Sequence, residues 1–266
     1  MTISSYPKIT IVTAVFNNVE FIEACLQSVL SQAYPNLEYI VVDGGSTDGT
    51  VDVLKKYESQ LSVLISEPDK GQSDALNKGF YRSTGDIIGW LNADERYEAD
   101  TLGLVGREFA AAPGLDFFYG NRIVVDVDGV ELERVRWTPL HPIRHILHLR
   151  TVLPTDASFW RRRIQNELKT LDVENFPHLG MDVDWFLRLS VQVKKWKKTS
   201  AFLVKYIDRD DRMTMLGVKE NPNRPHENHE LARKKLFLTH PMSRTRLAWG
   251  RFTSRFLNRL YRLTQR

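Results

Sequence analysis

Short apolar runs alternate with amphipathic segments over the first hundred residues. The runs are rich in β-branched residues and predict buried strands at Lys8–Val15, Leu37–Val42, Leu61–Ile65 and Asp86–Leu91. Apolar residues at helical spacing predict helices at Phe21–Leu30, Val51–Tyr57, Ser73–Tyr81 and Asp100–Ala112. This alternation, with short connections, predicts an α/β fold: a mostly parallel, Rossmann-like sheet with helices on both faces.

The second half of the chain has a less regular pattern. The apolar segments Phe117–Val125 and Val130–Trp137 flank a turn of Asp and Gly residues, which predicts a hairpin. Ala157–Arg161 is a further candidate strand. Asp182–Val191 is predicted to form an amphipathic helix, and the acids in its first turn suit the helix dipole.

Composition excludes several classes of protein. The chain has 266 residues, of which 42% are hydrophobic and 26% charged, so it is neither disordered nor collagen-like and can bury a full core. Its single cysteine, Cys25, rules out an intramolecular disulfide and a cysteine-rich zinc site, and fits a reducing compartment. No apolar run approaches the roughly 18 residues of a membrane span. The first eight residues lack the pattern of a secretory signal, so we expect a cytoplasmic protein.

The net charge of +4 is unevenly distributed. Residues 231–266 contain ten of the 37 Lys and Arg residues and no Asp or Glu. The remaining body has a net charge of −6, which argues against nucleic acid as a partner. We therefore expect three parts: residues 1–112, residues 113–230 and the basic tail at 231–266.

Polar residues follow each of the four predicted strands in the first half. They are Asn17, the segment Asp43–Asp48, the segment Glu67–Lys70 and the segment Asn92–Glu95. In a parallel sheet, ligands bind at the carboxyl ends of the strands. We therefore expect these four segments to surround one site.

Three residues in these segments and the helix that follows suggest contacts with a nucleotide. Asp43 precedes two glycines that allow close backbone approach, and its carboxylate can accept a hydrogen bond from the N–H of a base such as uracil. The alternative is a turn aspartate that bonds only its own backbone. Lys70 is a candidate for phosphate contact, and Asp74 shares a helix face with Asn77 that is predicted to point to the pocket. The alternative for this stretch is a solvated loop that enters a surface helix.

Asn92 and Asp94 place two oxygen-bearing side chains after the fourth strand. At positions i and i+2 of an extended strand they point to the same side, so one can bind a divalent cation while the other contacts a ribose or sugar. Mn²⁺ and Mg²⁺ prefer oxygen ligands, and one or two carboxylates plus a diphosphate are sufficient. The alternative is that Asp94 and Glu95 only favour the dipole of the following helix.

Together these segments resemble the family 2 glycosyltransferases, which have the GT-A fold. The similar segments, in family order and at family-like spacing, are Thr13–Asn18, Val42–Thr50, Glu67–Gly79 and Gly85–Glu95. The resemblance is strong over about residues 7–110 and weaker through residues 159–162 and Met181–Leu189. It implies an inverting glycosyltransferase that uses a nucleotide-sugar donor and Mn²⁺ or Mg²⁺.

The resemblance also implies roles for individual residues. Asp43 matches the aspartate that contacts the base, and the first-strand segment with Thr13, Val15 and Asn17 matches the part whose backbone contacts base and ribose. Asp94 matches the metal-binding aspartate of the D-x-D motif. Asn92 stands where the first aspartate of that motif often stands, so one charge is lost and Glu95 is a candidate to assist.

An inverting transfer needs a carboxylate that takes a proton from the acceptor hydroxyl. Gly180–Leu189 resembles the segment that carries this base in the family, and the match assigns the role to Asp182. Asp184 lies about 200° further around a helix and cannot share the role. Trp185 is a candidate wall for the acceptor or the donor sugar. The alternative is a plain amphipathic helix with acids in its first turn.

Two groups of residues leave the metal chemistry open. Family members often have a histidine loop after this helix, but residues 205–214 contain no His, so Arg209 or Arg212 would neutralise the diphosphate, or Asp210 would bind the metal. The second group consists of three histidines whose spacing suggests a zinc site, but a convincing third ligand is lacking. The alternative is that these histidines lie on a surface helix or on a helix of the acceptor site. They are His141, His145 and His148.

Residues 244–266 predict an amphipathic C-terminal helical extension with an aromatic stripe and an arginine stripe. This is typical of a segment that lies on an anionic membrane surface. The alternative is a helix that packs on the main domain or on a second subunit, so a homo-oligomer is also possible.

From these observations we expect a peripheral enzyme on the inner face of the membrane. It would transfer a sugar from a UDP-linked donor to a hydroxyl of a glycan or lipid-linked acceptor, in surface polysaccharide or glycolipid synthesis. One alternative is a non-catalytic GT-A-fold module of a membrane-associated assembly. A nucleotidyltransferase is the other, but it would need a glycine-rich and basic phosphate loop where this chain has Phe16–Glu20.

Overall fold

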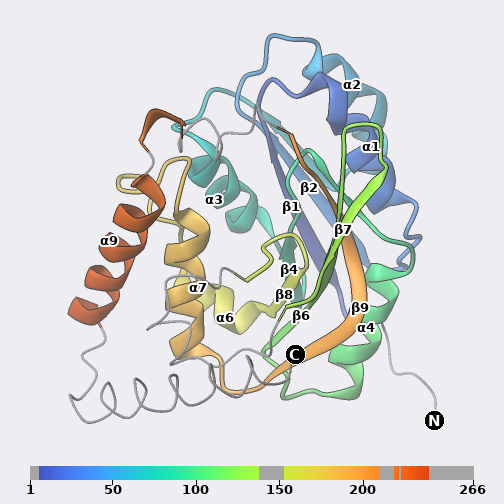
Figure 1. Ribbon diagram of the computed structural model, residues 1–266. Helices are drawn as coiled ribbons and strands as arrows, with labels where there is room; N and C mark the ends of the chain where they lie inside the picture. The colour runs from blue at the N-terminus through green and yellow to red at the C-terminus, as the bar shows by residue number, and fades with distance from the viewer. Residues whose placement is uncertain (1–5, 138–152, 210–218, 222, 240–266) are drawn as a thin grey trace.

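The computed structural model describes residues 6–137, 153–209, 219–221 and 223–239. A nine-stranded sheet has helices on both faces (Figure 1). Its strands are β1 (Ile9–Val15), β2 (Leu37–Asp43), β3 (Val63–Ser66), β4 (Ile87–Trp90), β5 (Glu95–Tyr97), β6 (Phe117–Val125), β7 (Glu131–Val135), β8 (Ser158–Arg161) and β9 (Trp196–Ile207). Its helices are α1 (Val19–Leu30), α2 (Thr50–Tyr57), the short 3₁₀ helix η1 (Glu58–Gln60), α3 (Gln72–Arg82), α4 (Thr101–Ala111), α6 (Arg162–Leu168), α7 (Met181–Gln192) and α9 (Arg224–Thr239).

The sheet combines a parallel half and a mixed half. In the order β3-β2-β1-β4-β8-β6-β9-β5, the first four strands are parallel, as the strand–helix alternation predicts. Beyond them, β8 is antiparallel to both β4 and β6, β7 forms the expected hairpin with β6, and β9 runs parallel to β6. The β4–β8 pairing joins the two halves of the chain into one sheet, so the acid-rich loops after β1, β2 and β4 share an edge with the entry to β8.

Several elements differ from the sequence-based prediction. Strand β3 begins at Val63, two residues later than expected, because Leu61 and Ser62 connect the end of η1 to the strand. Neither β5 nor β9 was expected, since β5 has three residues and β9 is only partly buried along much of its length. Helix α9 crosses the boundary between residues 230 and 231, where we expected the basic tail to begin.

Two hydrophobic clusters fill the two faces of the sheet. Side chains of α3, α6, α7 and α9 form one cluster, and side chains of α1, α2 and α4 form the other. In the first, the Trp185 ring stacks on Phe80 at 5.8 Å between centroids and lies 5.8 Å from Trp160. Trp185 is fully buried, so the expectation that it forms a sugar-binding wall is wrong: it is a core residue.

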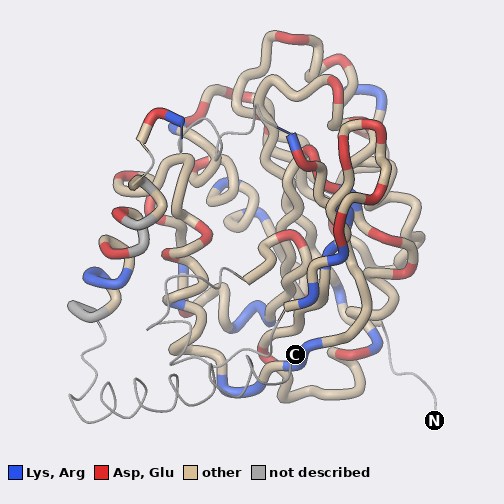
Figure 2. The backbone as a smooth tube through the Cα atoms, viewed as in Figure 1, with Lys and Arg blue, Asp and Glu red and all other residues tan. Residues whose placement is uncertain are grey.

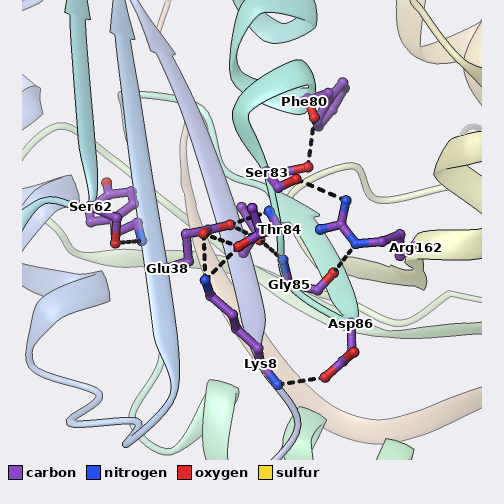
Figure 3. A network of polar contacts seen from close by, with 11 residues as sticks. Lys8, Glu38, Ser62, Phe80, Ser83, Thr84, Gly85, Asp86 and Arg162 are labelled. Carbon is purple, nitrogen blue, oxygen red and sulfur yellow. Dashed lines mark hydrogen bonds and ion pairs between the residues drawn. The ribbon is translucent and has the colours of Figure 1, made fainter.

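The amino-terminal edge of the sheet carries a dense polar network (Figure 3). The Glu38 carboxylate accepts hydrogen bonds from Lys8 Nζ at 2.7 Å, Thr10 Oγ1 at 2.6 Å and Thr84 N at 2.6 Å. Burial alone would raise the pKa of Glu38, but these donors outweigh it and lower the pKa to about 2. Arg162 extends the network by donating to the carbonyls of Ser83 and Gly85. The network ties β1, β2 and β4 together at the edge opposite the acid-rich loops.

A pocket of about 590 Å³ also lies at the amino-terminal edge, between the residues after α4 and the start of β9. Lysines gather at the start of β9 (Figure 2), and Lys194, Lys195 and Trp196 line this pocket. It is therefore separate from the acid-rich loops at the carboxyl edge.

No helix within the described ranges is long and apolar enough to cross a membrane. Some predicted features lie outside the described residues. They are the membrane-binding stripe at 244–266, the histidines His141, His145 and His148, and the candidates Asp210 and Arg212.

Candidate active site

The loop after β1 is joined to the loop after β2. Asn17 Oδ1 accepts a hydrogen bond from Thr47 N at 2.9 Å, and Asn17 N donates to Ser46 Oγ at 2.7 Å. Asn17 has a φ of 45°, in the left-handed region that asparagine tolerates better than most residues. Below this junction, Gly44 N donates to Val15 O at 2.9 Å. The carboxyl ends of β1 and β2 thus form one continuous rim.

Asp43 holds this rim together from within. Its side chain is fully buried, and its carboxylate accepts hydrogen bonds from the backbone N–H of Gly45 and Ser46, each at 3.2 Å. It also accepts a hydrogen bond from Ser66 Oγ at 2.7 Å, which links the end of β2 to the end of β3. Asp43 therefore stabilises its own turn and also joins the ends of β2 and β3, and its contact with a base stays a prediction.

Thr13 does not lie at the rim. It is fully buried, and its hydroxyl is 3.2 Å from the hydroxyl of Tyr39 inside the core. The Thr13 side chain therefore belongs to the core, and a contact of its backbone with the nucleotide stays a prediction. Val15 is nearer to the rim, at the last position of β1, with its side chain buried.

The loop before α3 combines an exposed cation with a partnered carboxylate. Lys70 is exposed, and its backbone N–H donates to Asp74 Oδ2 at 3.1 Å. The Asp74 carboxylate also lies 3.9 Å from Lys78 Nζ. Asn77 does not point to a pocket as expected: its amide exchanges two hydrogen bonds with the backbone of Leu171. Of the predicted helix face, only Asp74 is directed toward the loop.

Asn92 and Asp94 lie in a tight turn, with Glu95 N donating to Asn92 O at 3.0 Å. The extended i, i+2 geometry predicted for them is therefore wrong. Asn92 Oδ1 accepts hydrogen bonds from Gln72 Nε2 at 2.9 Å and Trp90 Nε1 at 3.0 Å. Its amide nitrogen donates to Glu95 Oε1 at 3.0 Å. Asn92 thus connects the turn to the first residue of α3, a link that no sequence motif indicated.

The Asp94 carboxylate faces Arg209, whose Nη2 lies 3.3 Å away. The Arg209 guanidinium also lies 4.5 Å from the centre of the Phe21 ring. Of the two arginines proposed from sequence, Arg209 is thus placed beside the predicted metal-binding aspartate. One partly exposed carboxylate fits a Mn²⁺ or Mg²⁺ ion that takes its other ligands from a diphosphate and water. Within the described residues, no group of three or more His, Cys, Asp or Glu side chains could hold a metal by itself.

Glu95 and Asp156 are buried side chains next to this turn. Burial, the charge of Asp156 and the charge of Asp94 together raise the pKa of Glu95 well above its usual range. Asp156 is fully buried at the entry to β8, the strand that pairs with β4. Sequence reasoning did not select Asp156, because only the antiparallel pairing of β8 brings it to the carboxyl edge.

Asp182 lies in the first turn of α7, after Gly180, which adopts a φ of 81°. Burial raises the pKa of the Asp182 carboxyl. A base with a raised pKa accepts a proton more readily, as the predicted role requires. Asp184, by contrast, binds Arg188 Nε at 2.8 Å, so it faces elsewhere on the helix as expected.

Contacts between the starts of α3 and α7 bring Asp182 to the same edge. Ser73 N donates to Pro177 O at 3.0 Å, and Ser73 Oγ donates to Phe176 O at 2.5 Å. A Cβ atom at Gly71 would lie 2.6 Å from the His178 ring, so glycine is needed for this close approach. The neighbouring residue of α3, Gln72, is the one that binds Asn92. The loop before Asp182 and the turn that contains Asp94 are thus joined through one helix terminus.

Known proteins share both the sequence pattern and the fold. The chain is 28% identical to the uncharacterized glycosyltransferase Rv1514c of Mycobacterium tuberculosis over 195 residues, 71% of each chain. It is 31% identical over 136 residues to TuaG of Bacillus subtilis, a putative teichuronic acid biosynthesis glycosyltransferase, covering 50% of this chain and 54% of TuaG. It is also 31% identical over 160 residues to a PGL/p-HBAD biosynthesis glycosyltransferase of Mycobacterium bovis, covering 59% of this chain and 60% of that protein.

Two solved structures have the same fold at low sequence identity. The S. aureus TarS 1–349 complex with UDP-GlcNAc matches with a TM-score of 0.67 and 17% identity, over 91% of this chain and 69% of that one. The mannosyltransferase PcManGT of Pyrobaculum calidifontis, in complex with GDP-Man and Mn²⁺, matches with a TM-score of 0.62 and 17% identity, over 94% and 70%. In another TarS 1–349 structure the chain spans 60% of the length. The fold is therefore GT-A, which confirms the fold predicted from the motifs.

The family itself follows from the sequence. The model of the family described as "Glycosyl transferase family 2" matches residues 10–180, more than half of the chain. This range contains the rim loops, the Asn92–Glu95 turn and the loop that precedes α7. The chain belongs to glycosyl transferase family 2 and is a glycosyltransferase.

Proposed function

We propose that this enzyme transfers a sugar from a UDP-linked donor to a hydroxyl of a glycan or lipid-linked acceptor, with inversion at the anomeric carbon. The observation that supports this is a pair of contacts at the start of α3: Ser73 binds Phe176 and Met181, next to Asp182, and Gln72 binds Asn92 in the turn that contains Asp94. Burial also raises the pKa of Asp182, as a general base requires. TuaG is named for teichuronic acid biosynthesis and the Mycobacterium bovis relative for PGL/p-HBAD biosynthesis, which supports a surface-glycan or glycolipid acceptor.

In the proposed reaction the acceptor oxygen attacks the anomeric carbon while the bond from that carbon to the diphosphate oxygen breaks. Asp182 takes the proton of the acceptor hydroxyl. Arg209 supplies positive charge beside Asp94. When bound at Asp94, a Mn²⁺ or Mg²⁺ ion would offset charge on the leaving diphosphate. Asp43 stays our candidate for the base contact, and the backbone of Thr13, Val15 and Asn17 for base and ribose contacts. Lys70 stays our candidate for the phosphate contact, and Asp74 for a further contact in the same pocket.

Calorimetric titration with UDP, GDP and dTDP, with and without Mn²⁺, tests the donor site. We expect manganese-dependent binding of UDP that weakens at least tenfold in Asp94→Ala, because the variant loses the carboxylate that orients the cation. Asp128→Ala, at the exposed hairpin turn, is the matched control and should bind UDP normally. A folded wild type that binds none of the three diphosphates would favour the non-catalytic module instead.

We also propose that residues 244–266 hold the enzyme on the inner face of an anionic membrane. The arginine stripe of the tail supports this proposal, since juxtamembrane basic groups are each worth about 1 kcal/mol near an anionic surface. Co-sedimentation with phosphatidylglycerol vesicles should retain the full chain and release a variant in which the five tail residues Arg251, Arg255, Arg259, Arg262 and Arg266 are glutamine. Equal retention of both would instead favour packing of the tail on the domain or on a second subunit.

A further inference from the structure

The pocket at the amino-terminal edge combines apolar residues with lysines. Its apolar lining comes from residues 112–115, after α4, and from Trp196 at the start of β9. Trp196 is half-buried and packs against the hydrophobic cluster that contains the side chains of α7. We call this hollow of about 590 Å³ the lysine pocket, and the proposed function uses none of its residues. Its basic lining is formed by three exposed lysines, Lys194, Lys195 and Lys197.

A buried carboxylate fixes the backbone that carries two of these lysines. Asp116 Oδ2 accepts hydrogen bonds from Lys194 N at 2.8 Å and from Lys195 N at 3.0 Å. The other oxygen of Asp116 forms an ion pair with Arg163, so this carboxylate does not balance the lysine ammonium groups. A Cβ atom at Gly114 would lie 3.3 Å from Lys195 Nζ, so this ammonium group lies close to the loop after α4.

Two of the three lysines lack a counter-charge. Lys197 Nζ lies 2.5 Å from a carboxylate oxygen of Glu108. Within the described ranges, the ammonium groups of Lys194 and Lys195 have no carboxylate partner. Residues 231–266 contain no Asp or Glu, so the basic tail cannot supply the missing negative charge. An external anion would therefore meet two unpaired cations here.

The lining of the pocket favours an amphiphilic anion over a small hydrophilic one. The lysine ammonium is a compact point charge that suits a phosphate group. A tryptophan that packs on the protein with one side and is exposed on the other is typical of the boundary between water and lipid headgroups. A small phosphate would leave Trp196 and residues 112–115 without an apolar contact, whereas an anionic phospholipid carries both a phosphate and acyl chains.

The basic tail begins on the same side of the molecule as the lysine pocket. Helix α9 starts beside the start of α7, where Asn228 Nδ2 donates to Leu179 O at 3.2 Å. It then runs in the same direction as α7, toward the end of that helix (Figure 1). The end of α7 leads directly into Lys194 and Lys195. One flat anionic surface could therefore contact both the lysine pocket and the tail.

We propose that the lysine pocket is a contact site for an anionic phospholipid membrane, in which Lys194 and Lys195 bind lipid phosphate groups and Trp196 contacts the lipid next to them. The proposal rests on the proposed function and adds that the domain itself, and not only the tail, meets the membrane. The amino-terminal edge of the sheet then faces the bilayer, and the carboxyl edge with Asp94 faces away from it. The acceptor is accordingly a glycan end that extends from the membrane.

Co-sedimentation of the full chain with phosphatidylglycerol vesicles tests the two cations. We expect the double variant Lys194→Gln/Lys195→Gln to bind at least tenfold more weakly than the wild type, because each basic group near an anionic surface contributes about fivefold. The double variant Lys55→Gln/Lys56→Gln is the matched control, since it removes an exposed pair of lysines from α2. It should bind within twofold of the wild type. UDP affinity, measured on the same samples, reports on folding and should not change.

Fluorescence quenching by phosphatidylglycerol with brominated acyl chains tests the contact of Trp196 with lipid. Trp249→Phe serves as the parent chain, because it removes the tryptophan of the tail. Further replacement by Trp196→Phe should abolish most of the quenching seen in the parent. Glycerol phosphate at millimolar concentration distinguishes a soluble phosphate ligand from a membrane, and it should not displace the parent chain from the vesicles.

The two experiments together decide the proposal. It is supported if the Lys194/Lys195 variant loses vesicle binding, the Lys55/Lys56 variant keeps it, and Trp196 is quenched. It is overturned if the two lysine variants bind vesicles equally, if Trp196→Phe leaves quenching unchanged, or if glycerol phosphate displaces the protein. Failure of the wild type to bind UDP would contradict the donor proposal alone. Retention of the variant with five tail glutamines would contradict the tail proposal alone.

Discussion

The pKa of Glu38, at one edge of the sheet, is shifted in the opposite direction from the pKa of Glu95 and Asp182 at the other edge. At the amino-terminal edge, Glu38 accepts hydrogen bonds from Lys8, Thr10 and Thr84, and its pKa falls to about 2 (Figure 3). At the carboxyl edge, burial raises the pKa of both Glu95 and Asp182. The same side-chain chemistry therefore stabilises the fold at one edge and favours proton uptake at the other. The difference lies in the donors around each carboxylate and in the charge of its neighbours.

The largest expected effect is a loss of catalytic activity that distinguishes Asp182 from Asp184, two aspartates of helix α7. Asp182→Asn should lower donor hydrolysis, with water as the acceptor, by about 10²–10⁴-fold, because it removes the general base. Its free energy of unfolding should stay near the wild-type value. Asp184→Asn should instead weaken a buried pair with Arg188 and destabilise the protein by about 3 kcal/mol, while the folded fraction keeps its turnover.

Release of UDP from UDP-GlcNAc and urea unfolding measure the two quantities on both variants. UDP binding by calorimetry serves as the control that the donor site is intact. Near-normal hydrolysis by Asp182→Asn would remove Asp182 from the role of base.

The second-largest expected effect is a loss of stability when the polar network at the amino-terminal edge is broken. Glu38→Gln should lower the free energy of unfolding by about 3 kcal/mol, because Lys8 loses its partner and the donors lose a charged acceptor. UDP binding should not change, since the network lies at the opposite edge. Urea unfolding measures the loss, and Glu58→Gln, at an exposed position of η1, is the control. Equal stability of the two variants would contradict the stabilising role of the network.

The smallest effect is the pH dependence of the same contribution. The pKa of Glu38 is lowered from its ordinary value of 4.5 to about 2 on folding, so its stabilisation is complete above pH 4.5 and is lost as pH falls toward 2. The stability difference between wild type and Glu38→Gln should therefore shrink over this range. Urea unfolding at several pH values between 2 and 6 measures it. A difference independent of pH would show that the carboxylate charge is not what stabilises the edge.

Much of the first half of the fold could be predicted from the sequence. Strands β1, β2 and β4 are short apolar runs, and the helices between them repeat their apolar residues at helical spacing. Strand β9 could not be found in this way, because it is partly buried along much of its length and has a mixed pattern of polar and apolar residues. Strand β5 has three residues, fewer than a periodic pattern needs.

In the candidate site, too, some features could be predicted from local sequence and others could not. Asp43, Asp94 and Asp182 stand in local motifs, and a motif of neighbouring residues is visible in the sequence without knowledge of the fold. The contacts of these residues could not be predicted in this way. Asn92 lies in a turn instead of the expected extended strand, and Asp43 joins the turn after β2 to the end of β3.

The sequence by itself determined the family, the succession of the first strands and helices along the chain, and which residues match the family's motifs, because these depend on local pattern. Only the tertiary structure decided which distant residues meet. Arg209 reached Asp94 from 115 positions along the chain, and Asp156 reached Arg122 through the antiparallel entry of β8. It also decided that Trp185 fills the core while Trp137 stays partly exposed. Burial and pairing between separate elements depend on how the layers pack, and no local pattern contains that information.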